Sequence, residues 1–320
     1  MQIKNLVFES PFFLAPLAGY TDAPFRHIAH DWHSACAVTE MVSAEGLARN
    51  SGKTEDLLAR YEGEEKLIVQ LFAPSRDPVQ RCLDRLLKHD PAMIDINCGC
   101  PVPKVVKTGA GSAMMRHIDD IYDIVSFLCA NAGCPVSVKF RLGWDSGSIN
   151  WPEFASACVS AGASMLTLHA RTRSQMYSGK ADWTQIRKLK EMFRDTDVKI
   201  FASGDLFTAE DGISVMRQTG CDGVMFARGA IGNPFIFTRA EELLRGNSRV
   251  ISTDEIRNTM LRHLDYMIEH YGSEVGCRDM RKHAVHYVKG LAGASRVKAV
   301  INSARTRQDY LEALSLLEDI

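Results

Sequence analysis

The chain has 320 residues, of which 46% are hydrophobic and 24% are charged, and its net charge is −1 at pH 7. These values are ordinary for a soluble globular protein, and the length suffices for one large α/β domain with a smaller appendage. No apolar run approaches the ~20 residues that cross a bilayer, and the N-terminus does not resemble a signal peptide, so we expect no membrane partner. The nine cysteines are scattered and form no CxxC pair. This pattern predicts reduced thiols and a cytoplasmic location.

Short apolar or β-branched segments alternate with helical segments as far as about residue 240. Cap signals precede several helices, as with Asp182 before Trp183, and Thr208 with Asp211 three residues later. This number of alternating units favours a (β/α)8 TIM barrel over an open sheet. The predicted strands are 12–15, 35–39, 67–72, 93–96, 136–140, 165–168, 198–202 and 223–226. The predicted helices between them are 24–33, 78–88, 118–130, 152–161, 183–193 and 209–218.

Beyond about residue 240 the strand signals stop, and three segments, 254–270, 278–291 and 306–318, have helical patterns. We therefore expect a barrel domain over residues 1–245 and an all-helical domain over residues 246–320, which begins with a linker at 246–253.

A loop rich in Gly and Pro follows the predicted strand 93–96 and presents the thiol of Cys100, with Cys98 two residues before it. In a barrel of this kind, active sites are built where strands end, so Cys100 is a candidate catalytic residue, and we expect Cys98 to be structural. Cys98 and Cys100 have no second ligand pair, so no metal is predicted. Gly109-Ala110-Gly111 fails the Rossmann pattern, and Gly52-Lys53-Thr54 fails the P-loop pattern and is predicted to be an exposed loop.

Polar residues and glycines gather at the ends of the predicted strands. Each of these residues, taken alone, can be explained without a functional role, since a Lys at a strand end is usually solvated and a His is usually structural. A barrel brings all of these ends to one rim, however, and glycines after the last two strands suit a phosphate. The set fits flavin mononucleotide (FMN). Its members are Gln70, Asn97, Lys139, Arg141, His169, Arg171, Gly204, Asp205, Arg228 and Gly229.

A basic segment lies near the C-terminus, where Arg278–Arg307 contains eight Lys or Arg residues and a single acid, Asp279, for a net +7. Such a segment on an otherwise acidic chain indicates a polyanion-binding surface. The alternative is a solvated helical face that binds nothing. The candidates for contact with RNA are Arg278, Arg281, Lys282, Lys289, Arg296 and Lys298.

The ordered motifs of the chain resemble those of the tRNA-dihydrouridine synthase family, and look closest to its bacterial B-like branch. The resemblance covers essentially the whole chain. The motifs are 15–22 (APLAGYTD), 24–26 (PFR), 39–41 (TEM), 97–101 (NCGCP), 139–143 (KFRLG), 169–172 (HART), 177–179 (YSG), 204–205 (GD), 227–229 (ARG) and 232–234 (GNP).

The resemblance implies an FMN-binding barrel, a helical tRNA-binding domain and roles for individual residues. Cys100 matches the catalytic acid, while Asn97, Arg141 and Tyr177 match residues that meet the target uracil. Leu17, Ser203 and Ala227 stand where Met, Asn and Gly are usual. The implied flavin contacts are Pro16, Leu17, Ala18, Gln70, Lys139, His169, Ser203, Gly204, Asp205, Ala227 and Arg228.

The implied reaction reduces uridine to 5,6-dihydrouridine, with a hydride from reduced FMN to C6 and a proton from Cys100 to C5. The resemblance alone implies NADPH or NADH as reductant, and we expect a monomer that binds tRNA. One alternative is an FMN barrel acting on a free pyrimidine, like a dihydroorotate dehydrogenase, which needs no basic helical segment. A second is a non-catalytic RNA-binding barrel without flavin, and a third is a flavin-free barrel isomerase that uses the phosphate site.

Overall fold

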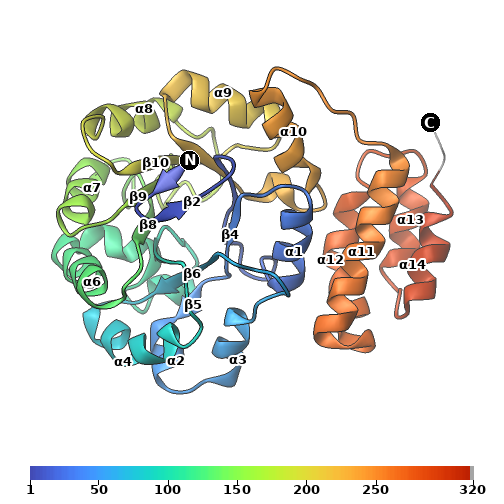
Figure 1. Cartoon of the computed structure of the whole chain (residues 1–320), viewed down its shortest axis with the longest axis horizontal. Helices are drawn as coiled ribbons and strands as arrows, with labels where there is room; N and C mark the ends of the chain where they lie inside the picture. Colours follow the sequence, from blue (N-terminus) through green and yellow to red (C-terminus); the bar gives the residue numbers. More distant parts are fainter. Residues whose placement is uncertain (318–320) are drawn as a thin grey trace.

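The computed structural model describes residues 1–317, and its centre is a closed barrel of parallel strands (Figure 1). Each strand pairs with its neighbour around the ring, and β11 pairs back with β3. The predicted (β/α)8 barrel is therefore confirmed. Within residues 1–317 the ring consists of β3 (Phe12–Leu14), β4 (Cys36–Val38), β6 (Leu67–Phe72), β7 (Met93–Cys98), β8 (Val136–Arg141), β9 (Met165–His169), β10 (Lys199–Ser203) and β11 (Gly223–Phe226).

Helices surround the ring and bury their apolar faces against it. The predicted caps are present: the Asp182 carboxylate accepts from Thr184 N, and Thr208 and Asp211 form a capping box. The surrounding helices are α1 (Ala23–Asp31), α4 (Arg76–Leu87), α6 (Ile118–Asn131), α7 (Trp151–Ser160), α8 (Trp183–Met192), α9 (Ala209–Thr219) and α10 (Phe235–Leu244).

One end of the barrel is filled by apolar side chains. A hairpin of β1 (Gln2–Ile3) and β2 (Leu6–Val7) lies across the barrel at the N-terminus (Figure 1). Its Ile3, with Phe8 just after it, packs into the same buried cluster as Phe13, Phe201 and Met225 of the strands. Sequence analysis did not predict this hairpin, because its strands are only two residues long.

The second strand of the barrel is interrupted. After β4 ends at Val38, the chain leaves the sheet and rejoins it as β5 (Val42–Ser43), which pairs with the end of β6. Thr39 fixes the interruption, because its Oγ1 accepts from Gln70 N at 3.1 Å. Glu40 accepts from Gly19 N. The interruption brings Met41 to the rim of the barrel.

Short helices follow β5, namely α2 (Ala44–Ala48), α3 (Gly52–Glu55) and η1 (Asp56–Leu58). The prediction of a loop at Gly52–Thr54 was wrong, since these residues begin α3. Ser51 precedes this helix as its N-cap, and no residue of α3 is buried. An exposed single turn of this kind carries no apolar periodicity that would reveal it in the sequence.

The chain after residue 252 forms a bundle of helices beside the barrel (Figure 1). The prediction of helices in this part was correct, but α12 begins five residues earlier than expected and α13 was not predicted. Residue 318, the predicted end of the last helix, lies outside the described residues. No helix within residues 1–317 is long and apolar enough to span a membrane. The helices are α11 (Thr253–Tyr271), α12 (Ser273–Tyr287), α13 (Ala294–Ile301) and α14 (Arg307–Leu314).

Two buried histidines lie where this bundle meets the barrel. His263 and His283 are fully buried, their rings lie 4.6 Å apart, and both pack on Phe25 of α1. Burial lowers the pKa of His263 to about 3 and that of His283 well below its usual value, so both rings are neutral. Among the described residues, His263 Nε2 and both ring nitrogens of His283 have no hydrogen-bond partner.

Polar and backbone contacts also join the bundle to the barrel. Tyr266 of α11 donates to Asp31 of α1 at 3.0 Å. In the loop after β11, Gly232 packs so closely on the backbone of His286 and Tyr287 that a Cβ atom would overlap it. Since Gly232 has a φ of +65°, this close approach requires glycine.

Candidate active site

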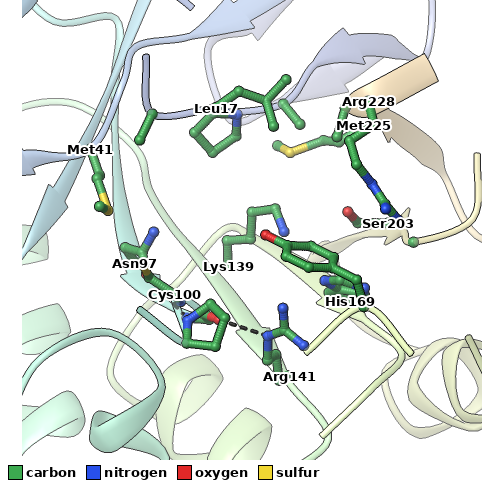
Figure 2. A pocket seen from close by; sticks show the side chains of 18 of the residues that line it. Leu17, Met41, Asn97, Cys100, Lys139, Arg141, His169, Ser203, Met225 and Arg228 are labelled. Carbon is green, nitrogen blue, oxygen red and sulfur yellow. Dashed lines mark hydrogen bonds between the residues drawn. The ribbon is translucent and has the colours of Figure 1, made fainter. Parts of the chain in front are cut away.

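A cavity of about 390 Å³ lies at the C-terminal ends of the barrel strands, which is within the usual size range of ligand pockets (Figure 2). Side chains from different strands and loops converge on it. Of the barrel residues that sequence analysis selected, Arg171 and Gly229 do not line it. The selected residues that do line it are Pro16, Leu17, Ala18, Gln70, Asn97, Cys100, Lys139, Arg141, His169, Tyr177, Ser203, Gly204, Asp205, Ala227 and Arg228. Sequence analysis did not select Tyr20, Met41, Phe207, Met225 and Ile231, which also line it.

The thiol of Cys100 lies at the edge of this cavity (Figure 2). Asn97, at the end of β7, holds the loop because its Oδ1 accepts from Cys100 N at 2.9 Å and from Gly99 N at 3.2 Å. Burial raises the pKa of Cys100 and outweighs the opposing effects of the Val102 N–H, Arg141 and Lys139. The group is therefore a protonated thiol at neutral pH, which is the form that a proton donor needs.

The neighbouring thiol, Cys98, has a different environment. Its side chain is fully buried in the core between strands and helices, and burial raises its pKa well above the usual value. The expectation that Cys98 is structural agrees with this burial.

Two cationic side chains from β8 reach into the cavity (Figure 2). Burial and the charge of Arg141 lower the pKa of Lys139 to about 8. Arg141 is held in place because its Nε donates to Gly99 O at 2.7 Å, and its Nη1 donates to Thr172 O and Met176 O. Its Nη2 has no hydrogen bond within residues 1–317 and is free to donate to a ligand. Burial also lowers the pKa of Arg141, to about 10.

A chain of hydrogen bonds connects Asn97 to the barrel interior. Asn97 Nδ2 donates to Gln70 Oε1 at 2.7 Å, and Gln70 Nε2 donates to Asp95 Oδ2 at 2.7 Å. The Ser137 hydroxyl donates to the other oxygen of Asp95 at 2.6 Å. The strand register explains this order, because Gln70 and Ser137 lie opposite Asp95 on the two neighbouring strands. Asp95 is fully buried.

His169 ends β9 and is 8% exposed. Burial and the nearby cations keep its pKa well below the usual value, so the ring is neutral. Arg171 Nη1 lies 3.3 Å from His169 Nε2. Because a guanidinium only donates, Nε2 accepts, and the ring proton lies on Nδ1.

An ion pair below this histidine joins two loops of the rim. Arg171 Nη2 contacts both carboxylate oxygens of Asp205 at 2.8 Å and also donates to Gly179 O at 2.7 Å. Arg171 Nε donates to Ser178 O. The Asp205 carboxylate accepts from Ala181 N as well. The pair thereby fixes the segment 172–181, which carries Tyr177 and the carbonyls that hold Arg141.

The side of the cavity across from Asn97 and Cys100 has features of an anion-binding site (Figure 2). Gly204 has a φ of +102°, and a Cβ atom there would lie 2.7 Å from His169 Cδ2, so only glycine leaves this space open. Arg228 is exposed, and its guanidinium lies between the rings of Tyr177 and Phe207, at 4.7 Å and 5.0 Å. Ser203 lines the cavity beside them (Figure 2).

The six cations selected as RNA contacts lie on or between α12 and α13. Arg278 forms an ion pair with Asp279, and Arg281 Nε donates to Ala304 O at 2.8 Å. Lys282 lies over the ring of Tyr20, which lines the cavity. The set consists of Arg278, Arg281 and Lys282 in α12, Lys289 after it, and Arg296 and Lys298 in α13.

A protonated thiol and two cationic side chains around a ligand-sized cavity at the strand ends are the features of a barrel enzyme. The family model described as "Dihydrouridine synthase (Dus)" matches residues 13–320. The chain belongs to the dihydrouridine synthase family.

Curated relatives match along nearly the whole chain. A "Probable tRNA-dihydrouridine synthase" of Treponema pallidum is 39% identical and covers 92% of this chain and 89% of its own length. The "tRNA-dihydrouridine synthase B" of Pasteurella multocida is 32% identical and covers 98% and 94%. The resemblance noted in the sequence is thus confirmed.

Solved structures share the fold at low identity. An old yellow enzyme homologue from Zymomonas mobilis is 11% identical with a TM-score of 0.51, and the match covers 78% of this chain and 94% of that one. Histamine dehydrogenase from Rhizobium sp. 4-9 is 13% identical with a TM-score of 0.54, covering 83% and 50%. At these identities the match concerns the fold alone.

Proposed function

We propose that this protein reduces uridines of tRNA to 5,6-dihydrouridine, with FMN as cofactor and NADPH or NADH as reductant. The observation that carries the proposal is the protonated thiol of Cys100 on a cavity that also contains Lys139 and Arg141, in a chain of the dihydrouridine synthase family. The names of the relatives support tRNA as the substrate.

The residues of the cavity fit FMN. The space at Gly204 and the guanidinium of Arg228, which has no carboxylate partner among the described residues, suit a phosphate. Pro16, Leu17 and Ala18 offer an apolar edge to a ring system, and Lys139 and Gln70 offer N–H donors to its carbonyls. Ser203, Asp205, Ala227 and His169 complete the proposed flavin contacts.

When bound in its reduced form, FMN supplies a hydride to C6 of the uracil ring. The C5=C6 bond is conjugated with the C4 carbonyl, so this addition leaves an enolate that needs a proton at C5. Cys100 donates that proton from Sγ, and its raised pKa keeps the thiol protonated until it is needed. The ammonium of Lys139 and Nη2 of Arg141 stabilise negative charge on the uracil oxygens.

Asn97 and Tyr177 hold the target base in this proposal. The base must leave the folded RNA to enter the cavity, as in other enzymes that act on single bases. The exposed ring of Tyr177 lies at the cavity edge, where it can pack against the entering nucleotide.

The helical part, residues 246–320, binds the tRNA backbone while the barrel, residues 1–245, performs the reaction. The basic residues of α12 and α13 support this division, because they adjoin the cavity through Lys282 and Tyr20.

The test uses unmodified tRNA transcripts, purified protein, FMN and NADPH, with dihydrouridine measured by mass spectrometry. We expect product from the native enzyme, and loss of nearly all product with retained yellow colour from Cys100→Ala. Absence of dihydrouridine with the native enzyme, and its presence in tRNA from cells that lack the protein, would refute the proposal. Cys98→Ala is the matched control and should stay active.

A further inference from the structure

The amide groups of Gln70 and Asn97 are oriented by the groups at both ends of one hydrogen-bond chain. At one end, Cys100 N and Gly99 N can only donate, so Asn97 must present its oxygen to them. Its Nδ2 then points to Gln70, which must accept through Oε1 at 2.7 Å. Gln70 Nε2 consequently points to the other end of the chain, where Asp95 accepts at 2.7 Å.

Each amide nitrogen of this chain has one N–H left over. Gln70 and Asn97 both line the cavity, as do Lys139 and Arg141. With the amides in this orientation, the polar side chains of β6, β7 and β8 on the cavity present N–H groups. Such a surface matches the carbonyl oxygens of pyrimidine and flavin rings. A reversed amide would instead place a carbonyl oxygen against them.

We infer that Asp95 is a positioning residue that fixes the orientation of Gln70, as the N–H groups of Gly99 and Cys100 fix that of Asn97, so that both amides donate to bound carbonyl groups. Asp95 touches no ligand itself, because it is fully buried and does not line the cavity. The inference rests on the proposed function. The hydrogen-bond network requires an acceptor at position 95 beside Gln70 Nε2, rather than a negative charge.

Two substitutions separate the acceptor from the charge. In Asp95→Asn, the amide oxygen can still accept from Gln70 while its nitrogen donates to Ser137, so kcat/KM for tRNA transcripts should stay within about threefold. In Asp95→Leu, no acceptor remains for Gln70 Nε2, and Gln70 is held only by its hydrogen bond from Asn97. We expect kcat/KM to fall about 10- to 100-fold, in the range that misplaced buried hydrogen bonds cost.

Ser137→Ala is the control, because it removes the other hydrogen bond to the same carboxylate and leaves Gln70 untouched. It should lower thermal stability without changing kcat/KM more than about twofold. Flavin content and thermal midpoint are measured for every variant. If Asp95→Leu does not fold, Asp95→Ala removes the same acceptor with a smaller side chain and should show the same loss.

An Asp95→Asn variant as impaired as Asp95→Leu would overturn the inference in favour of a role for charge. An Asp95→Leu variant that folds and keeps native activity would overturn it as well. Neither result touches the proposed function, which fails only if the native enzyme makes no dihydrouridine.

Discussion

The ammonium of Lys139 loses its proton close to neutral pH, because burial and Arg141 lower its pKa to about 8. In the proposed reaction, the charge that would stabilise the enolate is then present below about pH 8 and lost above it. Cys100 does not produce this change, because its pKa is raised from about 9. We therefore expect the rate to decrease above about pH 8 because of the lysine.

Lys139→Met should lower kcat/KM about 10- to 100-fold at pH 7, since one charged donor is lost. The decrease in rate near pH 8 should disappear with it. The measurement is the pH dependence of single-turnover reduction of tRNA transcripts between pH 6 and 9.5. A decrease near pH 8 that persists in the variant would contradict the assignment.

Gly204 provides a second test among single residues. In Gly204→Ala, the new methyl group would meet the His169 ring at 2.7 Å in a backbone conformation that disfavours side chains. We expect weaker flavin binding and a loss of stability of roughly 2 kcal/mol. The control is Gly220→Ala, which also has a positive φ but has nothing within 4 Å, so it should cost about 1 kcal/mol and leave flavin binding intact.

Among the elements, the segment 172–181 depends on the Arg171–Asp205 pair. Arg171→Lys cannot contact both carboxylate oxygens and the carbonyls of Ser178 and Gly179 at once. Because Arg171 is 1% exposed, the loss should approach roughly 3 kcal/mol. Hydrogen exchange of 172–181 should accelerate. Arg187→Lys, in an exposed pair on α8, is the control and should change little.

The stabilisation that the Arg171–Asp205 pair contributes depends on pH. The Ala181 N–H and Arg171 outweigh burial and lower the pKa of Asp205 below 3.8. The stabilisation is therefore complete above about pH 4, and it is lost as the pH falls through the lowered pKa. Protection of 172–181 that decreases already at pH 6 would contradict this assignment.

The regular elements were predictable because their apolar periods are long enough to recognise. The strand β6 agrees exactly with the predicted 67–72, and α9 differs from the predicted 209–218 by one residue. Two other elements were not predicted, each for a different reason. The helix α13 has eight residues, and its sequence was considered only for its charge. The hairpin at the N-terminus depends on packing into the barrel rather than on its own sequence.

The chemical residues of the cavity were predictable for a similar reason, since Lys139 or Cys100 at a strand end suggests chemistry. Met41, in the interruption between β4 and β5, and Met225, on β11, gave no such sign, because an apolar residue looks the same in the sequence whether it faces the core or a cavity. Asp95 was read only as part of an apolar strand. Its hydrogen bonds depend on the register between neighbouring strands, which the sequence does not reveal.

For the whole molecule, binding of tRNA should depend on the cations of the helical part. Replacing Lys282, Lys289 and Lys298 by Gln should lower the slope of log Kd against log salt by about 2, because each contact with a phosphate releases counterions. The measurement is tRNA binding between 50 and 300 mM KCl. Arg194→Gln, on the barrel surface and paired with Asp195, is the control. An unchanged slope in the triple variant would exclude this surface.

The neutral pair His263 and His283 makes the union of barrel and helices sensitive to acid. In the separated state both rings regain an ordinary pKa near 6.5, so separation takes up protons at any lower pH. Below about pH 6.5, each ring lowers the free energy of separating the helices from the barrel by about 1.4 kcal/mol per pH unit. This decrease continues down to the lowered pKa that the ring has in the intact protein. In an acidifying medium we expect the helices to detach while the barrel stays intact, which would leave the cavity of the barrel without the helices that we propose bind the RNA.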